Sequence, residues 1–271
     1  MASTPGDSYI FDQQWEKERA RLAGLSATFD ATTIRQLAAT GVSSGWHCLE
    51  VGAGTGTIAR WLATAVGPTG RVVATDRDTG FLRDLDGPPV EVVQHDVTSD
   101  PIEEHAFDLV HARALVEHLP DRAGVIARLT RALRPGGVMV LEDTVLDGHA
   151  TKLWERITCP PAAAAAMSHV ISAVASGFRA IGADPVFGVE LPSALRTAGL
   201  LHVEAELTYR LVYGGSPEAA FYELSLRQLG TRLIDAGLLA PQDEQEVAAM
   251  VKDPGASWLS LGLVSATGHA P

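Results

Sequence analysis

The chain has 271 residues, of which 46% are hydrophobic and 20% charged, a balance that favours a folded globular protein over a disordered one. Its formal net charge of -12 opposes binding to phosphate backbones, so we expect no nucleic acid partner. The sequence shows no secretory signal at its start and no run of about 18 apolar residues, so we expect a cytoplasmic protein with no membrane partner.

The first forty residues are predicted to form two helices, the second of them capped by Gly41. Short apolar segments then alternate with helical patterns, which is typical of a parallel α/β sheet. We predict strands at residues 46–51, 71–75, 90–94, 107–111 and 138–141, and helices at 58–66 and 125–133. These elements predict a doubly wound sheet with crossover helices.

Strands expected at 202–208 and 258–266 complete a seven-stranded, mostly parallel sheet. Helical patterns at 150–181 and 217–250 exceed what such a sheet needs, so we expect them, with the N-terminal helices, to form a lid over an acceptor pocket. The predicted segments are an N-terminal helical cap at 1–42, an α/β core at 43–149, a helical lid insertion at 150–185, and the last core strands at 186–271 with a helical insertion at 215–252.

A glycine-rich turn, Glu50–Gly56 (EVGAGTG), follows the first predicted strand and opens the first core helix. Glycines let the backbone turn sharply and approach a ligand beside a helix N-terminus. A dinucleotide fingerprint would have Gly or Ala where this chain has Thr57. Glu50 would also crowd a pyrophosphate, whereas it would attract an amino and sulfonium ligand. The pattern therefore favours S-adenosylmethionine over NAD.

Two carboxylates end the next predicted strands. Asp76 ends the second strand, where it can accept hydrogen bonds from both ribose hydroxyls. Asp96 ends the third strand and is placed to accept from an adenine amino group. The alternatives are a solvated loop acid for Asp76 and a turn or helix-cap residue for Asp96.

The ordered motifs LEVGAGTG, ATDRD, QHDV, FDLVHARALVEHLPD and LRPGGVMVLED resemble those of class I S-adenosylmethionine-dependent methyltransferases. Within that class the chain is similar to the ubiquinone/menaquinone-biosynthesis type and its small-molecule relatives. The resemblance covers about residues 46–143, and more loosely the N-terminal helices and residues 191–206. Five motifs in this order are specific for the cofactor class, but they carry almost no information about the substrate.

The resemblance implies a cofactor site at the carboxyl ends of the strands. It would place Glu50, Gly52 and Gly54 around the methionine part, Asp76 and Arg77 at the ribose and adenine, Asp96 and Val97 at the adenine edge, and Ala112 and Arg113 beside the sulfonium. Ala53 and Thr57 would be further cofactor-binding residues. Tyr9 and Trp15, on the predicted N-terminal helix, would close over the cofactor, and packing anchors are the alternative for both.

Methyl transfer from a sulfonium is a direct displacement, so the protein mainly has to align the acceptor, which is worth ~7–11 kcal/mol. A general base adds about 10²–10⁴-fold for a hydroxyl or carbon acid. The catalytic candidates are His118, Arg113 and Asp143, and His111, Glu117 and His169 are further candidate bases. For His118 a structural or cofactor role is the alternative.

The predicted substrate-lining residues belong to the helical insertions, and core packing is the alternative for each. They are His169, Met167, Phe178, Phe221 and Tyr222. No His/Cys cluster has zinc-ligand spacing, and the fourth strand leads into His111-Ala112-Arg113 rather than into a set of carboxylate ligands, so we expect no metal.

We therefore expect methyl transfer to a small apolar or aromatic molecule, at oxygen before carbon or nitrogen, in bacterial secondary metabolism, by a monomer or homodimer. One alternative is a family member that keeps S-adenosylmethionine but catalyses a non-methylating reaction such as a cyclisation. An NAD-dependent oxidoreductase is disfavoured by Thr57 and by the lack of a Tyr-x-x-x-Lys pair. A nucleic-acid methyltransferase is disfavoured by the net charge.

Overall fold

The computed structural model describes residues 10–12, 15–146 and 148–271, and it divides the chain into two compact units. The core unit comprises Phe29–Thr144, Phe187–Thr208 and Leu263–Pro271. The helical unit comprises the chain up to Thr28 together with Val145–Val186 and Tyr209–Gly262. The four segments predicted from the sequence stay a prediction.

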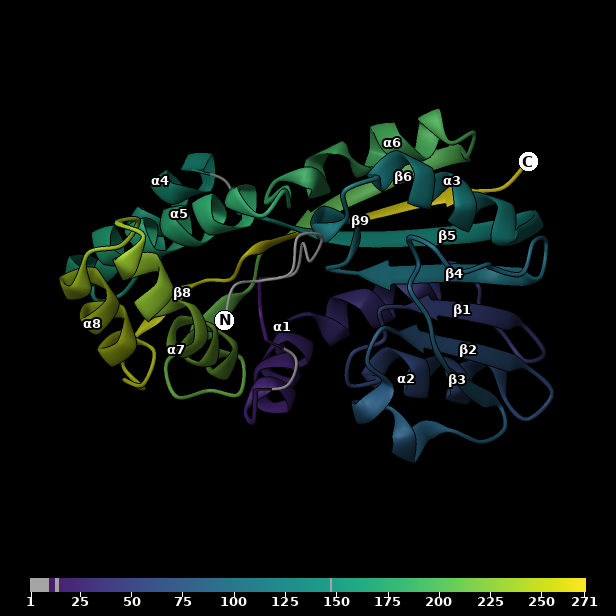
Figure 1. Ribbon diagram of the computed structural model, residues 1–271, viewed down its shortest axis with the longest axis horizontal. Coiled ribbons are helices and arrows are strands. Elements are labelled where there is room, and N and C mark those ends of the chain that lie inside the picture. Colours follow the sequence, from purple (N-terminus) through teal and green to yellow (C-terminus); the bar gives the residue numbers. More distant parts are fainter. Residues whose placement is uncertain (1–9, 13–14, 147) are drawn as a thin grey trace. The chain divides into compact units, whose positions relative to one another are not determined.

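A seven-stranded sheet forms the centre of the core unit, in the order β3-β2-β1-β4-β5-β9-β6 (Figure 1). Its strands are β1 (His47–Val51), β2 (Arg71–Asp76), β3 (Val90–Gln94), β4 (Phe107–Arg113), β5 (Leu133–Val145), β6 (Leu201–Thr208) and β9 (Gly262–His269). The first five strands pair in parallel, and β6 pairs antiparallel with β9. The predicted seven-stranded, doubly wound sheet is confirmed.

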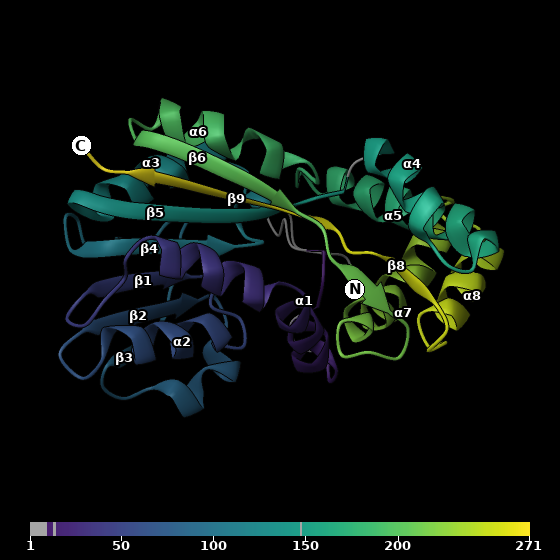
Figure 2. The ribbon, with the colours of Figure 1, turned by 180° about the vertical axis from the view of Figure 1, so that it is seen from behind.

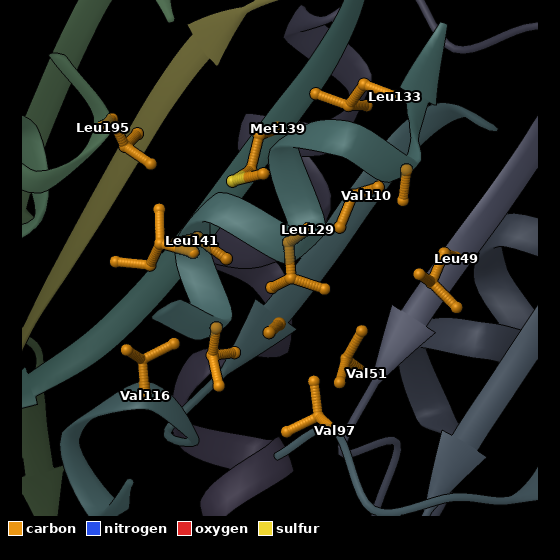
Figure 3. Close-up of a cluster of buried hydrophobic side chains, with 14 of the residues drawn as sticks. Leu49, Val51, Val97, Val110, Val116, Leu129, Leu133, Met139, Leu141 and Leu195 are labelled. Atoms are coloured by element: carbon orange, nitrogen blue, oxygen red, sulfur yellow. The ribbon is translucent and has the colours of Figure 1, made fainter. Parts of the chain in front are cut away.

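Helices and short 3-10 turns accompany the strands of the core unit. They are α2 (Thr57–Val66), η1 (Thr79–Phe81), η2 (Arg83–Leu85), η3 (Val116–His118), α3 (Arg122–Ala132), η5 (Phe187–Glu190) and α6 (Leu191–Thr197). Since successive strand side chains point to opposite faces, Leu49 and Cys48 of β1 belong to different buried clusters. Figure 3 shows the cluster that joins Leu49 to Leu129 of α3 and Leu195 of α6. Both faces of the sheet are therefore covered.

One helix, α1 (Glu18–Ala39), replaces the two helices predicted for the first forty residues. The sequence of α1 contains no proline and a single glycine, Gly24. A Cβ atom added at Gly24 would lie 2.5 Å from the backbone nitrogen of Phe221. The glycine thus permits a close approach without ending the helix. Trp15 lies before α1 rather than on it, which corrects a second expectation. Gly41, at φ 82°, follows the end of α1.

The late strand predicted at 258–266 is two strands, β8 (Ser257–Leu259) and β9. β8 pairs antiparallel with β7 (Leu211–Tyr213) in a separate two-stranded sheet. Between β8 and β9, the Ser260 amide donates to the Arg210 carbonyl at 2.7 Å and the Leu261 amide donates to the Tyr222 hydroxyl at 2.9 Å. These bonds occupy the amides that a continuous strand would use.

The helical unit contains the N-terminal part of α1 with α4 (Gly148–Ile157), η4 (Pro161–Ala163), α5 (Ala164–Ala180), α7 (Ala219–Asp235) and α8 (Pro241–Met250) (Figure 2). Its interior contains an aromatic cluster, in which Tyr222 packs edge-to-face on Phe221 and on buried Trp258. Within the described residues, the helical stretch Pro161–Ala180 alone is long and apolar enough to cross a membrane. Since 61% of its apolar window is buried in the structure, it has the burial of a core helix.

Candidate functional site

The glycine loop, Gly52–Gly56, turns the chain from β1 into α2. Gly52, Gly54 and Gly56 have φ values of 70°, 55° and 75°, the left-handed region that favours glycine. The loop is held by a bond from the Ala53 amide to the Thr75 carbonyl at 2.9 Å. Thr57 is the first residue of α2, so the loop leads directly to a helix N-terminus.

Gly56→Ala is expected to lower the free energy of unfolding by about 2–4 kcal/mol, because a left-handed alanine and an overfilled site both cost energy. A Cβ at Gly56 would lie 2.1 Å from Leu85 Cδ1 and 2.9 Å from Leu82 Cδ2. Urea denaturation measures the change. Gly136→Ala is the matched control, because Gly136 has φ 76° but no atom within 4 Å of the new Cβ. Equal losses in the two variants would contradict the steric part of the argument.

Asp76, at the end of β2, lies beside the glycine loop. Its Oδ2 accepts from the Gly54 amide at 2.9 Å, and its Oδ1 accepts from the Asp78 amide at 3.1 Å. Burial raises the pKa of Asp76 above its ordinary value, and the backbone donors oppose that rise. The Arg77 amide is a third backbone donor to this carboxylate. Because a carboxylate offers about four acceptor positions, capacity for a ribose hydroxyl remains. Arg77 follows directly, and its carbonyl accepts from Gln94 of β3 at 3.1 Å.

Asp96 and Val97 follow β3. Asp96 Oδ1 accepts from the Thr98 amide at 2.9 Å and from the Thr98 hydroxyl at 2.6 Å, which is the turn arrangement weighed as the alternative. The Thr98 hydroxyl lowers the pKa of Asp96. Val97 is buried in the cluster of Figure 3. Contact of both residues with adenine stays a prediction.

The segment after β4 approaches the glycine loop. Ala112 is buried. Ala114 has a positive φ of 50°, and its amide donates to the Glu142 carbonyl at 2.7 Å. The Leu115 Cδ1 atom lies 3.3 Å from the position that a Cβ atom on Gly52 would occupy. Sequence reasoning missed Leu115 as a site residue, although it lies within the motif FDLVHARALVEHLPD. Its contact with Gly52 makes it part of the candidate site.

Arg113, predicted beside the sulfonium and as a catalytic residue, forms bonds with α1. Its guanidinium donates to Asp30 Oδ1 and to the Thr33 hydroxyl, both at 2.8 Å. Asp30 and Thr33 were missed by sequence reasoning, since nothing in the pattern of α1 singles them out. The predicted roles of Arg113 stay predictions.

Asp143, Glu117 and His118 are buried together where β4 and β5 end. Asp143 accepts from the amides of Leu115 and Glu117, both at 3.0 Å. Glu117 accepts from the Thr144 amide at 2.9 Å, and its Oε1 lies 3.4 Å from His118 Nε2. Burial, and next the charge of Glu117, raise the pKa of Asp143 well above its ordinary value. The geometry shows Asp143 holding the η3 turn, and the catalytic roles of Asp143 and His118 stay predictions.

Glu50 and His111 are buried side by side and within hydrogen-bond distance of each other. Glu50 Oε2 lies 2.6 Å from His111 Nδ1, and Glu142 Oε2 lies 3.4 Å from His111 Nε2. Ser265 of β9 and Thr33 of α1 donate to Glu142. The alternation of side chains along the strands could have predicted that Glu50, His111 and Glu142 share one face, whereas the partners from α1 and β9 needed the structure.

The predicted substrate residues all lie in the helical unit. Met167, Phe178, Phe221 and Tyr222 are buried, whereas the His169 side chain is 62% exposed and pairs with Asp243 of α8 at 3.0 Å. Trp15 is half-buried, and Tyr9 lies outside the described residues. The described part of the chain contains no group of three or more His, Cys, Asp or Glu side chains that could hold a metal ion. The cofactor role of Trp15 and the substrate roles stay predictions.

Residues 49–141 match the model of the methyltransferase domain family. The ubiquinone/menaquinone biosynthesis C-methyltransferase UbiE of Burkholderia vietnamiensis is 33% identical over 140 residues, which are 49% of this chain and 54% of that protein. The chain thus spans about half the length of the curated relatives it matches. The match covers the strands and loops that carry the candidate site.

Solved structures agree in fold. A Bacillus halodurans C-125 structure, whose name describes a candidate methyltransferase, has a TM-score of 0.57 at 18% identity and covers 89% of this chain and 99% of that chain. The [4+2]-cyclase SpnF has a TM-score of 0.51 at 19% identity, and the match covers 100% of this chain and 87% of the SpnF chain. Fold and site thus define a methyltransferase-type Rossmann-like domain. Residues 49–141 are thus similar to a methyltransferase domain, and the motifs of the chain resemble those of class I S-adenosylmethionine-dependent methyltransferases.

Proposed function

We propose that the protein transfers a methyl group from S-adenosylmethionine to a small-molecule acceptor, with oxygen ahead of carbon and nitrogen. The observation that carries the proposal is the bond between the Gly54 amide and the Asp76 carboxylate. It joins the glycine loop to the acid of β2 at the carboxyl ends of neighbouring strands, where ligands bind in open α/β sheets. The match to the methyltransferase domain family supports methyl as the transferred group.

The residues at these strand ends fit the cofactor. Gly52 and Gly54 have the positive φ values of a tight turn that lets the backbone approach a ligand, and Asp76 keeps acceptor capacity for a ribose hydroxyl. When bound, the sulfonium of the cofactor supplies both the methyl group and its own leaving group. The chain must then hold the acceptor in line and exclude water.

His118 is the proton acceptor in this proposal when the methylated group is a hydroxyl. Its Nε2 lies 3.4 Å from Glu117 Oε1, which would stabilise the imidazolium that proton uptake creates. Asp143 fixes the backbone of Leu115 and Glu117 on either side of η3's first residue. It therefore acts as a positioning residue rather than as a second base.

Two measurements test the proposal. Calorimetric titration with S-adenosylhomocysteine and, separately, with NAD is expected to show binding of S-adenosylhomocysteine alone. Incubation with S-adenosylmethionine and a panel of hydroxylated aromatic compounds is expected to yield a product heavier by one methylene unit. NAD binding in place of S-adenosylhomocysteine would overturn the proposal.

A second candidate is a cyclisation or other non-methylating reaction that retains the cofactor. It is favoured by the fold similarity to the [4+2]-cyclase SpnF over the whole chain. Product mass separates the two, because an isomerising cyclisation leaves the mass of its substrate unchanged.

We also propose a small apolar or aromatic substrate, a cytoplasmic location and a role in secondary metabolism, for a monomer or homodimer. The apolar interior of the helical unit, with its cluster of Phe221, Tyr222 and Trp258, supports the substrate class. The net charge of -12 speaks against a nucleic acid acceptor.

A further inference from the structure

His111 lies in the middle of the core sheet with no exposed surface. Glu50 of β1 is its direct partner in the parallel register, and Glu142 of β5 lies on its other side. The two carboxylates are 4% and 1% exposed. Three ionisable side chains thus share one face of three adjacent strands, in a place where an unpaired charge would be costly.

The geometry distinguishes the two protonation states of His111. A neutral imidazole donates from one ring nitrogen only, whereas the imidazolium donates from both. Each ring nitrogen of His111 faces a carboxylate oxygen, Glu50 Oε2 at 2.6 Å and Glu142 Oε2 at 3.4 Å. Only the imidazolium satisfies both partners.

The network continues to α1, where Glu206 is the main partner of Arg35 and raises its pKa, to which the charge of Glu142 also contributes. Thr33 of α1 and Ser265 of β9 donate to Glu142, and Arg113 of β4 donates to Thr33 and Asp30. Cys48 of β1 shares the face, and α2 packs apolar side chains such as Ile58 and Leu62 against it. Burial, and next Asp108 and Glu50, raise the pKa of the Cys48 thiol to about 12, so it stays neutral.

We propose that protonated His111 is a positioning residue for the glycine loop. It fixes Glu50, two residues before Gly52, and it connects this point of β1 through Glu142 and Thr33 to α1. The expected effect on ligand affinity rests on the proposed function, whereas the protonation state of His111 does not. Neither His111 nor Glu142 needs to touch the ligand.

Burial alone would lower the pKa of His111, but Glu50 and Glu142 overcome that effect and raise it to about 9. Burial likewise disfavours the charged form of Glu142, but His111 and Arg113 hold its pKa below the ordinary value. Because the folded-state pKa of His111 is raised, its stabilisation is complete below about pH 6.5 and is lost as the pH rises through about 9. The network should therefore loosen at alkaline pH.

Nuclear magnetic resonance of the full chain with ¹⁵N-labelled histidine tests the protonation state directly, and His111→Gln assigns the signal. Both ring nitrogens of His111 are expected to be protonated up to pH 8, and one of the two protons is expected to be lost near pH 9. Glu142→Gln is expected to lower this midpoint, because it removes one negative charge. A neutral ring at pH 7 would overturn the proposal.

Calorimetry with S-adenosylhomocysteine from pH 7 to 10 tests the positioning role. His111→Gln is expected to raise the Kd at least tenfold at pH 7, whereas His269→Gln, at the far end of β9, should leave it unchanged. The affinity of the wild type for S-adenosylhomocysteine is expected to fall tenfold by pH 10. The affinity of Glu142→Gln is expected to show the same tenfold fall at a lower pH. The ligand's own amino group titrates identically in both experiments, so the shift between the two curves is the readout.

The positioning role would be refuted if the curves of affinity against pH coincided for the wild type and Glu142→Gln. It would also be refuted if His111→Gln bound S-adenosylhomocysteine as tightly as the wild type. If His111→Gln does not fold, the comparison of wild type with Glu142→Gln still decides. A wild type that fails to bind S-adenosylhomocysteine at pH 7 refutes the proposed function instead, and the resonance result then stands by itself.

Discussion

Asp76→Ala is expected to abolish measurable binding of S-adenosylhomocysteine, with a rise in Kd of about 10²–10⁴-fold. A hydrogen bond from a ribose hydroxyl to a charged acceptor is worth about 1.5–3 kcal/mol. The substitution also removes the acceptor of the Gly54 and Asp78 amides, 2.9 and 3.1 Å from the carboxylate oxygens. The glycine loop therefore loses a support in addition to the ligand contact. Isothermal titration calorimetry at pH 7 measures the loss.

Asp84→Ala is the matched control, because it removes the same charge from an exposed position in the neighbouring η2 turn. It is expected to bind within twofold of the wild type. Asp76→Asn separates the two effects, since the amide oxygen keeps one acceptor for Gly54 while the negative charge is lost. Retained micromolar affinity in Asp76→Ala would place the ribose elsewhere and remove Asp76 from the site.

The strands and the glycine loop could be predicted because their signals are local. Apolar runs such as those around Leu49 and Val110 identify buried parallel strands, and the spacing of Gly52, Gly54 and Gly56 matches three backbone positions with positive φ. These features depend on neighbours in sequence, so no knowledge of distant contacts is needed.

The errors arose where distant contacts decide the local structure. Two helices were predicted for the first forty residues, but α1 is continuous, and Gly24 within it allows Phe221 to approach. Tyr222, 39 residues away in sequence, binds the Leu261 amide and so separates β8 from β9. The bonds of Glu142 to Thr33 and Ser265 likewise join residues more than one hundred positions apart. No window along the chain contains such pairs.

Arg21→Ala is expected to be the most destabilising of these substitutions, lowering the free energy of unfolding by about 3–5 kcal/mol, the usual cost of breaking a buried ion pair from one side. Arg21 and Glu18 are 2% and 0% exposed, and they form two bonds of 2.8 and 2.6 Å. The guanidinium also lies 3.8 Å from the centre of the Phe11 ring, a contact that adds about 0.5–2 kcal/mol. Urea denaturation followed by tryptophan fluorescence measures the change.

Arg19→Ala, at an exposed position in the same turn of α1, is the control and should change stability by less than about 0.5 kcal/mol. The double variant Glu18→Gln with Arg21→Met tests the mechanism. It removes both charges and keeps most of the volume, so it is expected to recover much of the loss, because a buried pair replaced on both sides is often close to neutral. A double variant as unstable as Arg21→Ala would show that packing around Phe11, and not the unpaired Glu18 carboxylate, sets the cost.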